Sequence, residues 1–391
     1  LVALALAAHL VSRRLAPGAD PLPLPLAFLL NGLGLVMVHR IDYALVARGQ
    51  ASSLAPAQTL WTVVAVGAFC ATLVALRDHR QLDRYRYLIG VGALVLLALP
   101  SLPVIGATVN GAELWIRVAG LTIQPGEAAK LALVTFFASY LADKRQLLSV
   151  ATNRLGPVMV PPARAFGPII AIWAISLAVL VFQKDLGLSL LVFGVFILML
   201  YVATSRPAYV AGGALLFAAG AWFTHATFAH VQQRISIWLD PWADYQDRGF
   251  QLAQSLFALG TGGLAGVGLG QGRPDFIPAV ATDFIFAAFG EEAGLIGTTG
   301  LLLCYFLLVG RGLGIALRCR DDFGTLLAAG LTILFGLQVL IIVAGVTRLL
   351  PLTGLTLPLV SYGGSSLLAN HVLVALLLRV SAAEQAPAAR S

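Results

Sequence analysis

Ten apolar segments, each long enough to cross a lipid bilayer as a helix, recur along this 391-residue sequence. A bilayer core about 30 Å thick needs roughly 20 mostly apolar residues in a helix, whereas a membrane barrel shows alternating segments of about ten residues. The runs here are continuous, and only 11% of the residues are charged, so the sequence predicts an all-α polytopic membrane protein. The predicted spans cover 22–38, 59–77, 87–105, 126–142, 166–182, 186–203, 208–226, 283–310, 323–346 and 362–380.

Residues 1–11 are also apolar, and we expect them to be the end of an eleventh helix rather than a signal peptide. The chain then divides into an N-terminal element with a cytoplasmic link at 1–21, a membrane core at 22–380 and a cytoplasmic tail at 381–391. The longest stretch between spans, 227–282, is too rich in aromatic residues for a disordered tether. We expect it to fold onto the outer membrane surface, with a short amphipathic helix at 250–259.

The basic residues predict the orientation, because Lys and Arg are retained on the cytoplasmic side of short loops. With Arg13 and Arg14 placed inside, 16 of the 25 Lys and Arg residues fall on the inner side, and every inner loop is basic. Of the 18 carboxylates, 11 lie in outer loops or in the outer halves of helices. The formal charge of +7 is therefore mostly a topology signal, which gives a nucleic-acid partner little support. Any chemistry is expected to face outward.

The cysteines and histidines give no motif. The three cysteines, Cys70, Cys304 and Cys319, are scattered along the chain, so neither a disulfide framework nor a zinc pattern is indicated. The glycine cluster at 260–272 matches neither nucleotide-binding fingerprint, so ATP is not indicated.

The segment ATDFIFAAFGEE at 281–292 places three carboxylates at the start of a predicted span. Asp283 would lie near water, where it could act chemically or simply cap the helix. Glu291 would lie about 12 Å deeper, and both it and Glu292 are expected to join helices to one another. One face of this helix is small and would let a neighbouring helix or a lipid chain approach closely; it comprises Ala287, Gly290, Gly294 and Gly297.

Two further segments place charges at the outer ends of spans. In NGAELWIRVAGLTIQPGEAAK, at 110–130, Pro125 suits the first turn of a helix, which puts Glu127 and Lys130 one turn apart on one face. Lys130 could bind an anionic headgroup such as a phosphate, or it could form an internal ion pair with Glu127. In FQKDLGLSL, at 182–190, Asp185 lies in a tight outer turn that a solvated loop would also explain.

The segment TGLTLPLVSYGGSSL at 353–367 interrupts an apolar run with Pro358 and a Gly-Gly pair. Irregular backbone at membrane depth survives only where it lines a cavity or is buried in protein. Its hydroxyl groups could bind a sugar or a phosphate, or the segment could be a kinked packing helix; they belong to Ser361, Tyr362, Ser365 and Ser366. Together, these segments describe a site at the outer leaflet for an amphiphile with an anionic headgroup and a lipid tail.

With QKDLG and GFQLAQSLFALGTGGLAGVGLGQG, these segments resemble the successive signatures of the SEDS family, the RodA/FtsW peptidoglycan glycosyltransferases, from about residue 22 to 380. The resemblance implies a ten-span enzyme of the bacterial inner (cytoplasmic) membrane that polymerises lipid II into glycan strands at the outer face. It also implies a class B penicillin-binding protein as partner, besides membrane lipid. A lipid II flippase and a non-catalytic scaffold for a partner synthase are the alternatives.

By this resemblance, the family's essential aspartate is Asp283, which we expect to be the general base of an inverting transfer, with undecaprenyl diphosphate as the leaving group. Leu114 stands where the family often has an arginine, and Arg117, three residues on, is a candidate substitute. A divalent cation, Mg²⁺ or Mn²⁺, is expected at Asp283 and Asp275. Substrate contacts are expected from Lys130, Arg117, Glu127, Asp275, Asp185, Ser361, Tyr362, Ser365 and Ser366.

Overall fold

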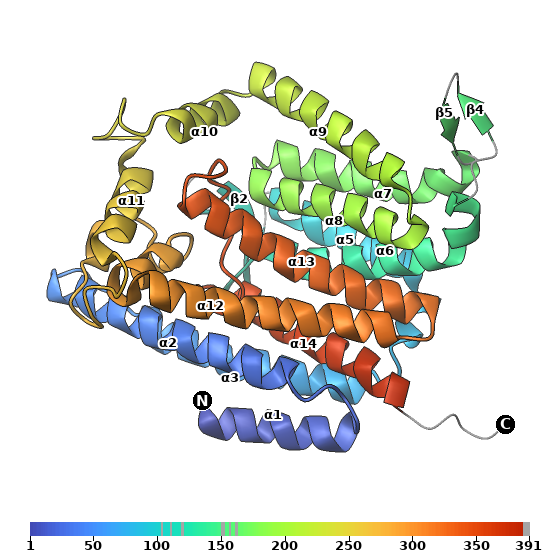
Figure 1. The fold of residues 1–391 in the computed structure, drawn as a ribbon, viewed down its shortest axis with the longest axis horizontal. Coiled ribbons are helices and arrows are strands. Elements are labelled where there is room, and N and C mark those ends of the chain that lie inside the picture. Colours follow the sequence, from blue (N-terminus) through green and yellow to red (C-terminus); the bar gives the residue numbers. More distant parts are fainter. Residues whose placement is uncertain are drawn as a thin grey trace.

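The computed structural model describes residues 1–102, 105–109, 112–118, 121–149, 153–155, 158–160 and 163–385. Most of its long helices run side by side along one axis of the molecule (Figure 1). Each predicted span corresponds to a helix: α2 (Pro23–Ala47), α3 (Leu54–Ala75), α5 (Arg86–Ala98), α6 (Pro125–Ser149), α7 (Ala163–Phe182), α8 (Leu186–Thr204), α9 (Pro207–Thr227), α12 (Ile285–Arg318), α13 (Asp322–Val346) and α14 (Gly364–Gln385). The N-terminal segment forms α1 (Val2–Leu15), and α4 (Gln81–Arg84) precedes α5.

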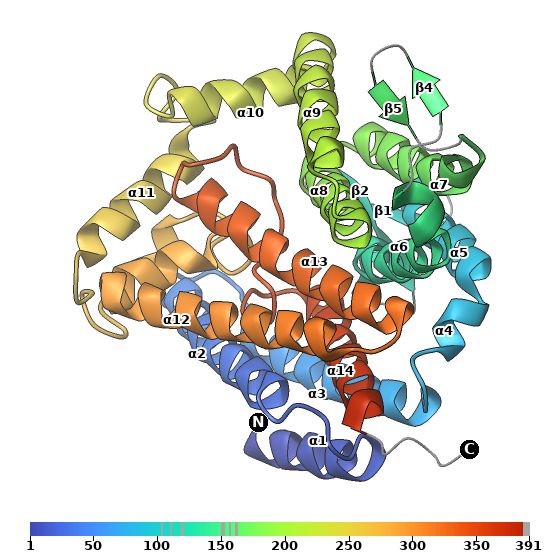
Figure 2. The same ribbon diagram turned by 45° about the vertical axis from the view of Figure 1, so that its right-hand side comes forward.

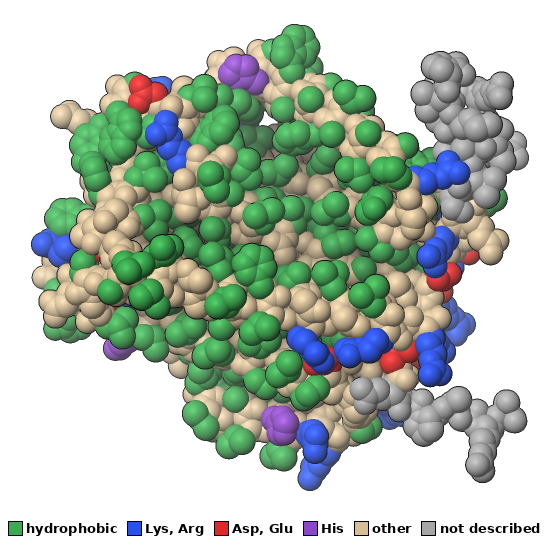
Figure 3. All heavy atoms as spheres, viewed as in Figure 1, with side chains coloured by type: hydrophobic (Ala, Val, Ile, Leu, Met, Phe, Trp, Pro, Cys, Tyr) green, Lys and Arg blue, Asp and Glu red, His purple; other side chains and the backbone are tan. Residues whose placement is uncertain are grey.

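The membrane character of the bundle agrees with the hydropathy of the sequence. Within the described residues, seven helices are long and apolar enough to cross a membrane, namely α2, α3, α8, α9, α12, α13 and α14. Shorter apolar helices cover Arg86–Ser101 and Phe166–Phe182. Hydrophobic side chains cover the middle of the molecule, whereas Lys, Arg and acidic side chains gather toward one end and the lower edge (Figure 3). The prediction of a polytopic helical membrane protein is therefore confirmed.

The centre of the bundle is α13, which contacts α6, α8, α12 and α14. Its side chains are apolar on nearly all sides, as expected for a helix surrounded by protein. In contrast, α9 is mostly exposed and contacts α8 and α10 (Ala229–Leu239). Helices α9, α10 and α11 (Phe250–Gly262) form an arc around one end of the bundle (Figure 2). The predicted short helix at 250–259 is thus confirmed as α11, whereas α10 was not predicted.

A small β-sheet between α5 and α6 was also not predicted. Strands β1 (Gly106–Val109), β2 (Ala112–Val118) and β3 (Leu121–Ile123) pair antiparallel in the order β1-β2-β3. The residues of β2 alternate in character, with Leu114 and Ile116 on one face and Arg117 on the other, which is the two-residue period of a strand. Helix α5 gives way at Leu99 to a short 3-10 helix that contains Pro100, so the predicted span 87–105 is too long. A second hairpin comprises β4 (Asn153–Leu155) and β5 (Val158–Val160).

The glycine-rich stretch after α11 docks against a break in α12. Gly294 has φ 66° and ψ −166°, a conformation essentially restricted to glycine. The backbone at the break is paired by the loop: Leu295 N donates to Gly263 O at 3.0 Å, and Ile296 N donates to Leu264 O at 3.1 Å. In the other direction, Gly268 N donates to Glu292 O at 3.1 Å. Loop and helix therefore share one hydrogen-bond network.

The small-residue face of α12 serves this packing. A Cβ added at Gly290 would lie 2.4 Å from a side-chain carbon of Leu259 in α11, so a neighbouring helix occupies this face. Glu291 and Glu292 hold the same region together, as expected. Glu292 forms an ion pair with Arg40 of α2 at 2.9 Å, and Glu291 accepts a hydrogen bond from Arg273 N at 3.0 Å.

Substitution Gly294→Ala tests the break. Backbone strain alone is expected to lower the free energy of unfolding by about 1 to 3 kcal/mol, and an added Cβ would lie 2.2 Å from Gly266 N. The melting temperature of the detergent-solubilised protein should therefore fall clearly. Gly300→Ala in the same helix is the matched control, because no atom lies within 4 Å of its added Cβ. Equal melting temperatures for the two variants would contradict this account of the break.

Candidate active site

Asp283 lies directly before α12, yet it does not cap that helix. The N-cap position is Phe284, and no side chain makes a cap hydrogen bond at this end, so the capping interpretation is wrong. The half-buried carboxylate instead interacts with the side chain of Thr282. Burial raises the pKa of Asp283 to about 6, although Thr282 and Arg234 oppose the shift. The pKa of Asp283 therefore lies closer to neutral pH than that of an ordinary aspartate.

The segment at 353–367 that runs into α14, here called the broken segment, holds the backbone directly before Asp283. Tyr362 N donates a hydrogen bond to Ala281 O at 2.7 Å, and Ser361 Oγ donates to Thr282 O at 2.5 Å. Ser361 Oγ also accepts a hydrogen bond from Leu357 N at 2.9 Å. The two residues that precede Asp283 are therefore fixed by a segment about 80 residues away in sequence.

Asp185 begins α8 and is buried, so the solvated-turn interpretation is wrong for this residue. Its carboxylate accepts a hydrogen bond from Leu188 N at 2.9 Å, which caps the helix. Burial raises the pKa of Asp185 to about 6; the Glu127 charge adds to the shift, and Arg234 and Lys130 oppose it. Asp185 is thus electrostatically joined to both predicted charges of α6.

Sequence analysis did not identify one arginine whose charge interacts with both of these aspartates. Arg234, on α10, interacts with the charges of both Asp185 and Asp283. Its Nη1 donates a hydrogen bond to Leu352 O at 2.9 Å, which fixes the guanidinium beside the loop that reaches Gly354. A Cβ added at Gly354 would lie 3.8 Å from Asp283 Oδ2, so this loop runs along the carboxylate. Burial lowers the pKa of Arg234, while the two carboxylates raise it.

Lys130 and Glu127 form the internal ion pair that sequence analysis left open. Lys130 Nζ lies 2.7 Å from Glu127 Oε2, and both side chains are buried. Nζ also donates to Gln338 Oε1 of α13 at 2.8 Å, and Gln338 Nε2 donates to Thr356 O at 2.8 Å. The lysine therefore links α6, α13 and the broken segment.

Arg117 does not take the place of Leu114. The two residues are three apart on β2, so their side chains point to opposite faces of the sheet. Leu114 lines a cavity of about 10 Å³, room for roughly one water, together with Gln124, Gln183 and Asp185. The Arg117 side chain is exposed. Arg234 on α10, and not Arg117, is the arginine whose charge interacts with Asp185.

Asp275 is engaged by other arginines. Its carboxylate forms ion pairs with Arg48, which directly follows α2, and with Arg273, the latter at 3.5 Å, and its side chain is almost fully buried. Both guanidinium groups also lie over the Phe276 ring, with Cζ atoms 3.9 and 4.5 Å from its centroid. This cluster joins the C-terminal end of α2 to the loop and leaves the Asp275 carboxylate already paired.

Three of the four predicted hydroxyl ligands have partners inside the fold. Besides Ser361, Ser365 Oγ accepts a hydrogen bond from Gln124 N at 2.9 Å, and Ser366 Oγ accepts one from Thr356 Oγ1 at 2.9 Å. All three serines are buried, whereas Tyr362 is partly exposed. The serines therefore join the broken segment to its neighbours, as the packing alternative predicts.

Comparison with known proteins supports a common fold and family. The family model described as "Cell cycle protein", FtsW/RodA/SpoVE, matches residues 22–386. Peptidoglycan glycosyltransferase RodA of Mycobacterium tuberculosis is 50% identical over 382 residues, which cover 97% of this chain and 81% of that protein.

Solved structures give the same result. The crystal structure of Thermus thermophilus rod shape determining protein RodA is similar with a TM-score of 0.66 and 26% identity, covering 95% of this chain and 99% of that chain. A chain from "Structural coordination of polymerization and crosslinking by a peptidoglycan synthase complex" is similar with a TM-score of 0.67 and 28% identity, covering 91% of this chain and 98% of its own.

Substitution Lys130→Met tests the buried pair. It leaves Glu127 buried without its cation, which should cost about 3 to 5 kcal/mol of stability. The double variant Glu127→Gln with Lys130→Met removes both charges and should recover part of that loss, as measured by thermal melting in detergent. Lys144→Met in the same helix is the control, because its pair with Asp143 is partly exposed and should be worth less than about 1 kcal/mol. Similar losses for both lysines would contradict a structural role for the pair.

Proposed function

The chain belongs to the FtsW/RodA/SpoVE family, and from this premise we propose how it acts as a peptidoglycan glycosyltransferase. The reaction joins two lipid-linked saccharides, with lipid II as donor: an acceptor sugar hydroxyl attacks the anomeric carbon of the donor. The bond from that carbon to the lipid diphosphate breaks, and the diphosphate leaves with the bonding electrons. One group must take the hydroxyl proton, and others must stabilise the departing negative charge.

Asp283 is the proposed general base. Its support is its position, because its carboxylate is half-buried, free of any capping role and interacts with the partly buried arginine whose charge also interacts with Asp185. Its raised pKa of about 6 supports the same role, because a base works best when its pKa lies near the operating pH. As a second carboxylate, Asp185 is tied to the start of α8, so direct displacement with inversion remains the simpler proposal.

Arg234 is the proposed stabiliser of the leaving diphosphate. Its charge interacts with both Asp185 and Asp283, and guanidinium groups match the geometry of phosphate oxygens. The charge of Lys130 also interacts with Asp185, although its ammonium is already bonded to Glu127 and Gln338. Arg117 is proposed as an exposed contact for the substrate.

Asp275 is a poorer ligand than Asp283 for the proposed divalent cation. The Asp275 carboxylate is paired with Arg48 and Arg273, so the two aspartates do not present a shared pair of free carboxylates. Asp283 alone could contribute a cation ligand, beside Arg234. The proton transfer and charge stabilisation described above are therefore assigned to the side chains of the chain itself.

We further propose an inner-membrane location with Asp283 on the outer side and a class B penicillin-binding protein as partner. The basic residues at the opposite end support this orientation. The similarity to a chain of a peptidoglycan synthase complex supports an assembly with a crosslinking enzyme. Co-purification of the two tagged proteins from the same membrane tests the partnership.

Substitution Asp283→Asn tests the base assignment. It keeps the size of the side chain but removes the proton acceptor, so lipid II polymerisation should fall by about 10²- to 10⁴-fold in a gel assay of glycan chains. The exposed Asp247 belongs to the loop before α11, and Asp247→Asn should retain activity. Unchanged polymerisation by a folded Asp283→Asn protein would remove the assignment, and it is also the result expected of a scaffold.

The pH dependence of polymerisation gives a second test. Because the pKa of Asp283 is raised to about 6, its carboxylate is increasingly protonated as the pH falls through 6. The value of kcat/KM should therefore fall about tenfold per pH unit below 6 and level off above 7. Arg234 lowers the pKa of Asp283, so in Arg234→Gln the acidic limb of the profile, where kcat/KM falls with pH, should move to higher pH. A limb that stays in place in Arg234→Gln would contradict the electrostatic link between the two residues.

A further inference from the structure

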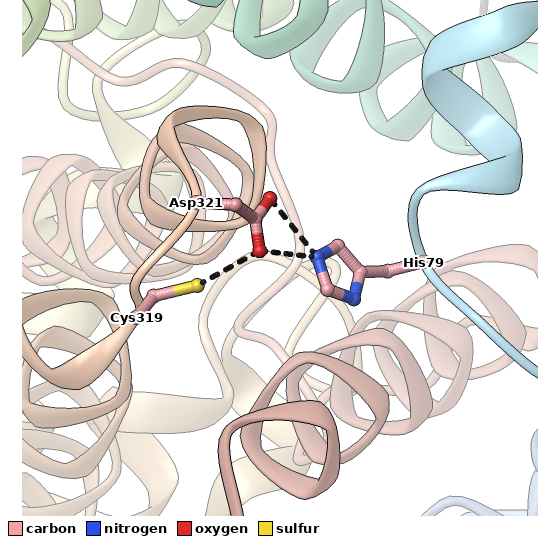
Figure 4. Close-up of side chains that lie close together, drawn as sticks. All are labelled: His79, Cys319 and Asp321. Carbon is pink, nitrogen blue, oxygen red and sulfur yellow. Dashed lines mark hydrogen bonds and ion pairs between the residues drawn. The ribbon is translucent and has the colours of Figure 1, made fainter. Parts of the chain in front are cut away.

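Three different types of metal-binding side chain meet at the end of the bundle opposite Asp283. His79 lies between α3 and α4, while Cys319 and Asp321 lie in the turn that joins α12 to α13. Their side chains point toward one another (Figure 4). His79 Nε2 is 3.2 and 3.3 Å from the two Asp321 carboxylate oxygens, and Cys319 Sγ is 3.7 Å from Oδ1. One ligand atom of each residue lies within 4.8 Å of the other two.

The three atoms also converge on the backbone of Gly324. A Cβ added at Gly324 would lie 2.6 Å from Cys319 Sγ, 2.7 Å from His79 Nε2 and 3.1 Å from Asp321 Oδ1. A glycine in a helix costs roughly 0.5 to 1 kcal/mol relative to alanine. Because residue 324 is glycine, no side chain occupies the space next to all three donor atoms.

We propose that His79, Cys319 and Asp321 bind a divalent transition-metal ion, with zinc as the best match to the donors. Zinc accepts imidazole nitrogen, thiolate sulfur and carboxylate oxygen in a tetrahedral arrangement. Bonds of about 2.0 to 2.3 Å at tetrahedral angles place neighbouring donor atoms roughly 3.3 to 3.8 Å apart. The His79–Asp321 and Cys319–Asp321 separations match this spacing. Calcium and magnesium prefer oxygen ligands and do not match it.

The groups around the cluster orient its ligand atoms. His79 is fully buried, and within the described residues its Nδ1 has no hydrogen-bond partner, although Asp78 Oδ1 lies 3.5 Å away. A metal-bound histidine commonly directs its second nitrogen toward such a carboxylate. Asp321 Oδ2 accepts a hydrogen bond from Gly324 N at 2.8 Å, which leaves Oδ1 to act as the ligand.

Two neighbours complete the surroundings. Glu384, near the end of α14, interacts with the Cys319 thiol and accepts a hydrogen bond from Arg320 N at 3.0 Å, so it lies beside the cluster. Arg80 Nη2 lies 3.3 Å from Asp321 Oδ1, but this arginine side chain is 61% exposed and is free to turn toward solvent when a cation binds. A bound ion would then fasten the α3–α4 link to the α12–α13 turn.

Cobalt(II) substitution tests the proposal on the full-length protein in detergent. After removal of metal with EDTA, added Co²⁺ should produce a thiolate-to-cobalt charge-transfer band in the near ultraviolet at one ion per chain. Added Zn²⁺ should displace the cobalt and abolish the band. Cys319→Ser should remove the band, and His79→Gln should weaken metal binding by at least about tenfold.

Cys304→Ser is the matched control, because Cys304 lies within α12, outside the cluster, and is also a partly buried free thiol. This variant should keep the band. Gly324→Ala fills the position that the donors face, so it should lose the band while its helix propensity improves. The absence of a band in the native sequence, or its persistence in Cys319→Ser, would overturn the site.

Thermal melting keeps the test decisive if a variant folds poorly. Zn²⁺ should raise the melting temperature of the native sequence and of Cys304→Ser, and EDTA should reverse the change. A melting temperature of the native sequence that does not respond to either reagent would count against a bound ion at these turns. Polymerisation activity is not needed for any of these measurements, so they are independent of the role of Asp283.

Discussion

The buried ion pair of Glu127 and Lys130 is the interaction on which the framework of the site depends. Two opposite charges can be removed from water together only if each satisfies the other and the remaining donors find acceptors. Lys130 achieves this through Glu127 and Gln338, and Gln338 continues to Thr356. A single chain of contacts therefore joins α6 and α13 to the broken segment, and that segment holds the backbone that leads into Asp283.

Electrostatics in the site follow from this framework. Asp185 and Asp283 are both shielded from water, which raises the pKa of each to about 6, and Arg234 opposes the shift in both. One partly buried arginine thus opposes the pKa shift of two carboxylates that lie just before different helices. In the proposed mechanism the same arginine attracts the diphosphate, so binding of the anionic leaving group and the basicity of Asp283 would be coupled through Arg234.

Hydropathy predicted the spans because partitioning into lipid is a local property of each segment. Contacts between segments that are distant in sequence could not be predicted in this way. Arg234 could not be assigned to Asp185 and Asp283 from sequence, since only folding brings these separate segments together. The sheet at 106–123 lies in a stretch where no helix or strand was predicted, although the apolar residues Leu114, Ile116 and Val118 alternate with others as in a strand. The break at Gly294 escaped because hydropathy carries no information about backbone dihedral angles.

That break also changes which part of α12 must partition into hydrocarbon during biogenesis. Residues 295–318 number 24, and such a helix is roughly 36 Å long, enough to cross the bilayer without the turns that precede Gly294. Glu291 and Glu292 belong to those earlier turns, so the membrane-insertion machinery need not carry either carboxylate into lipid. Arg40 is synthesised long before Glu292, so its partner is already in place when the acidic turn emerges.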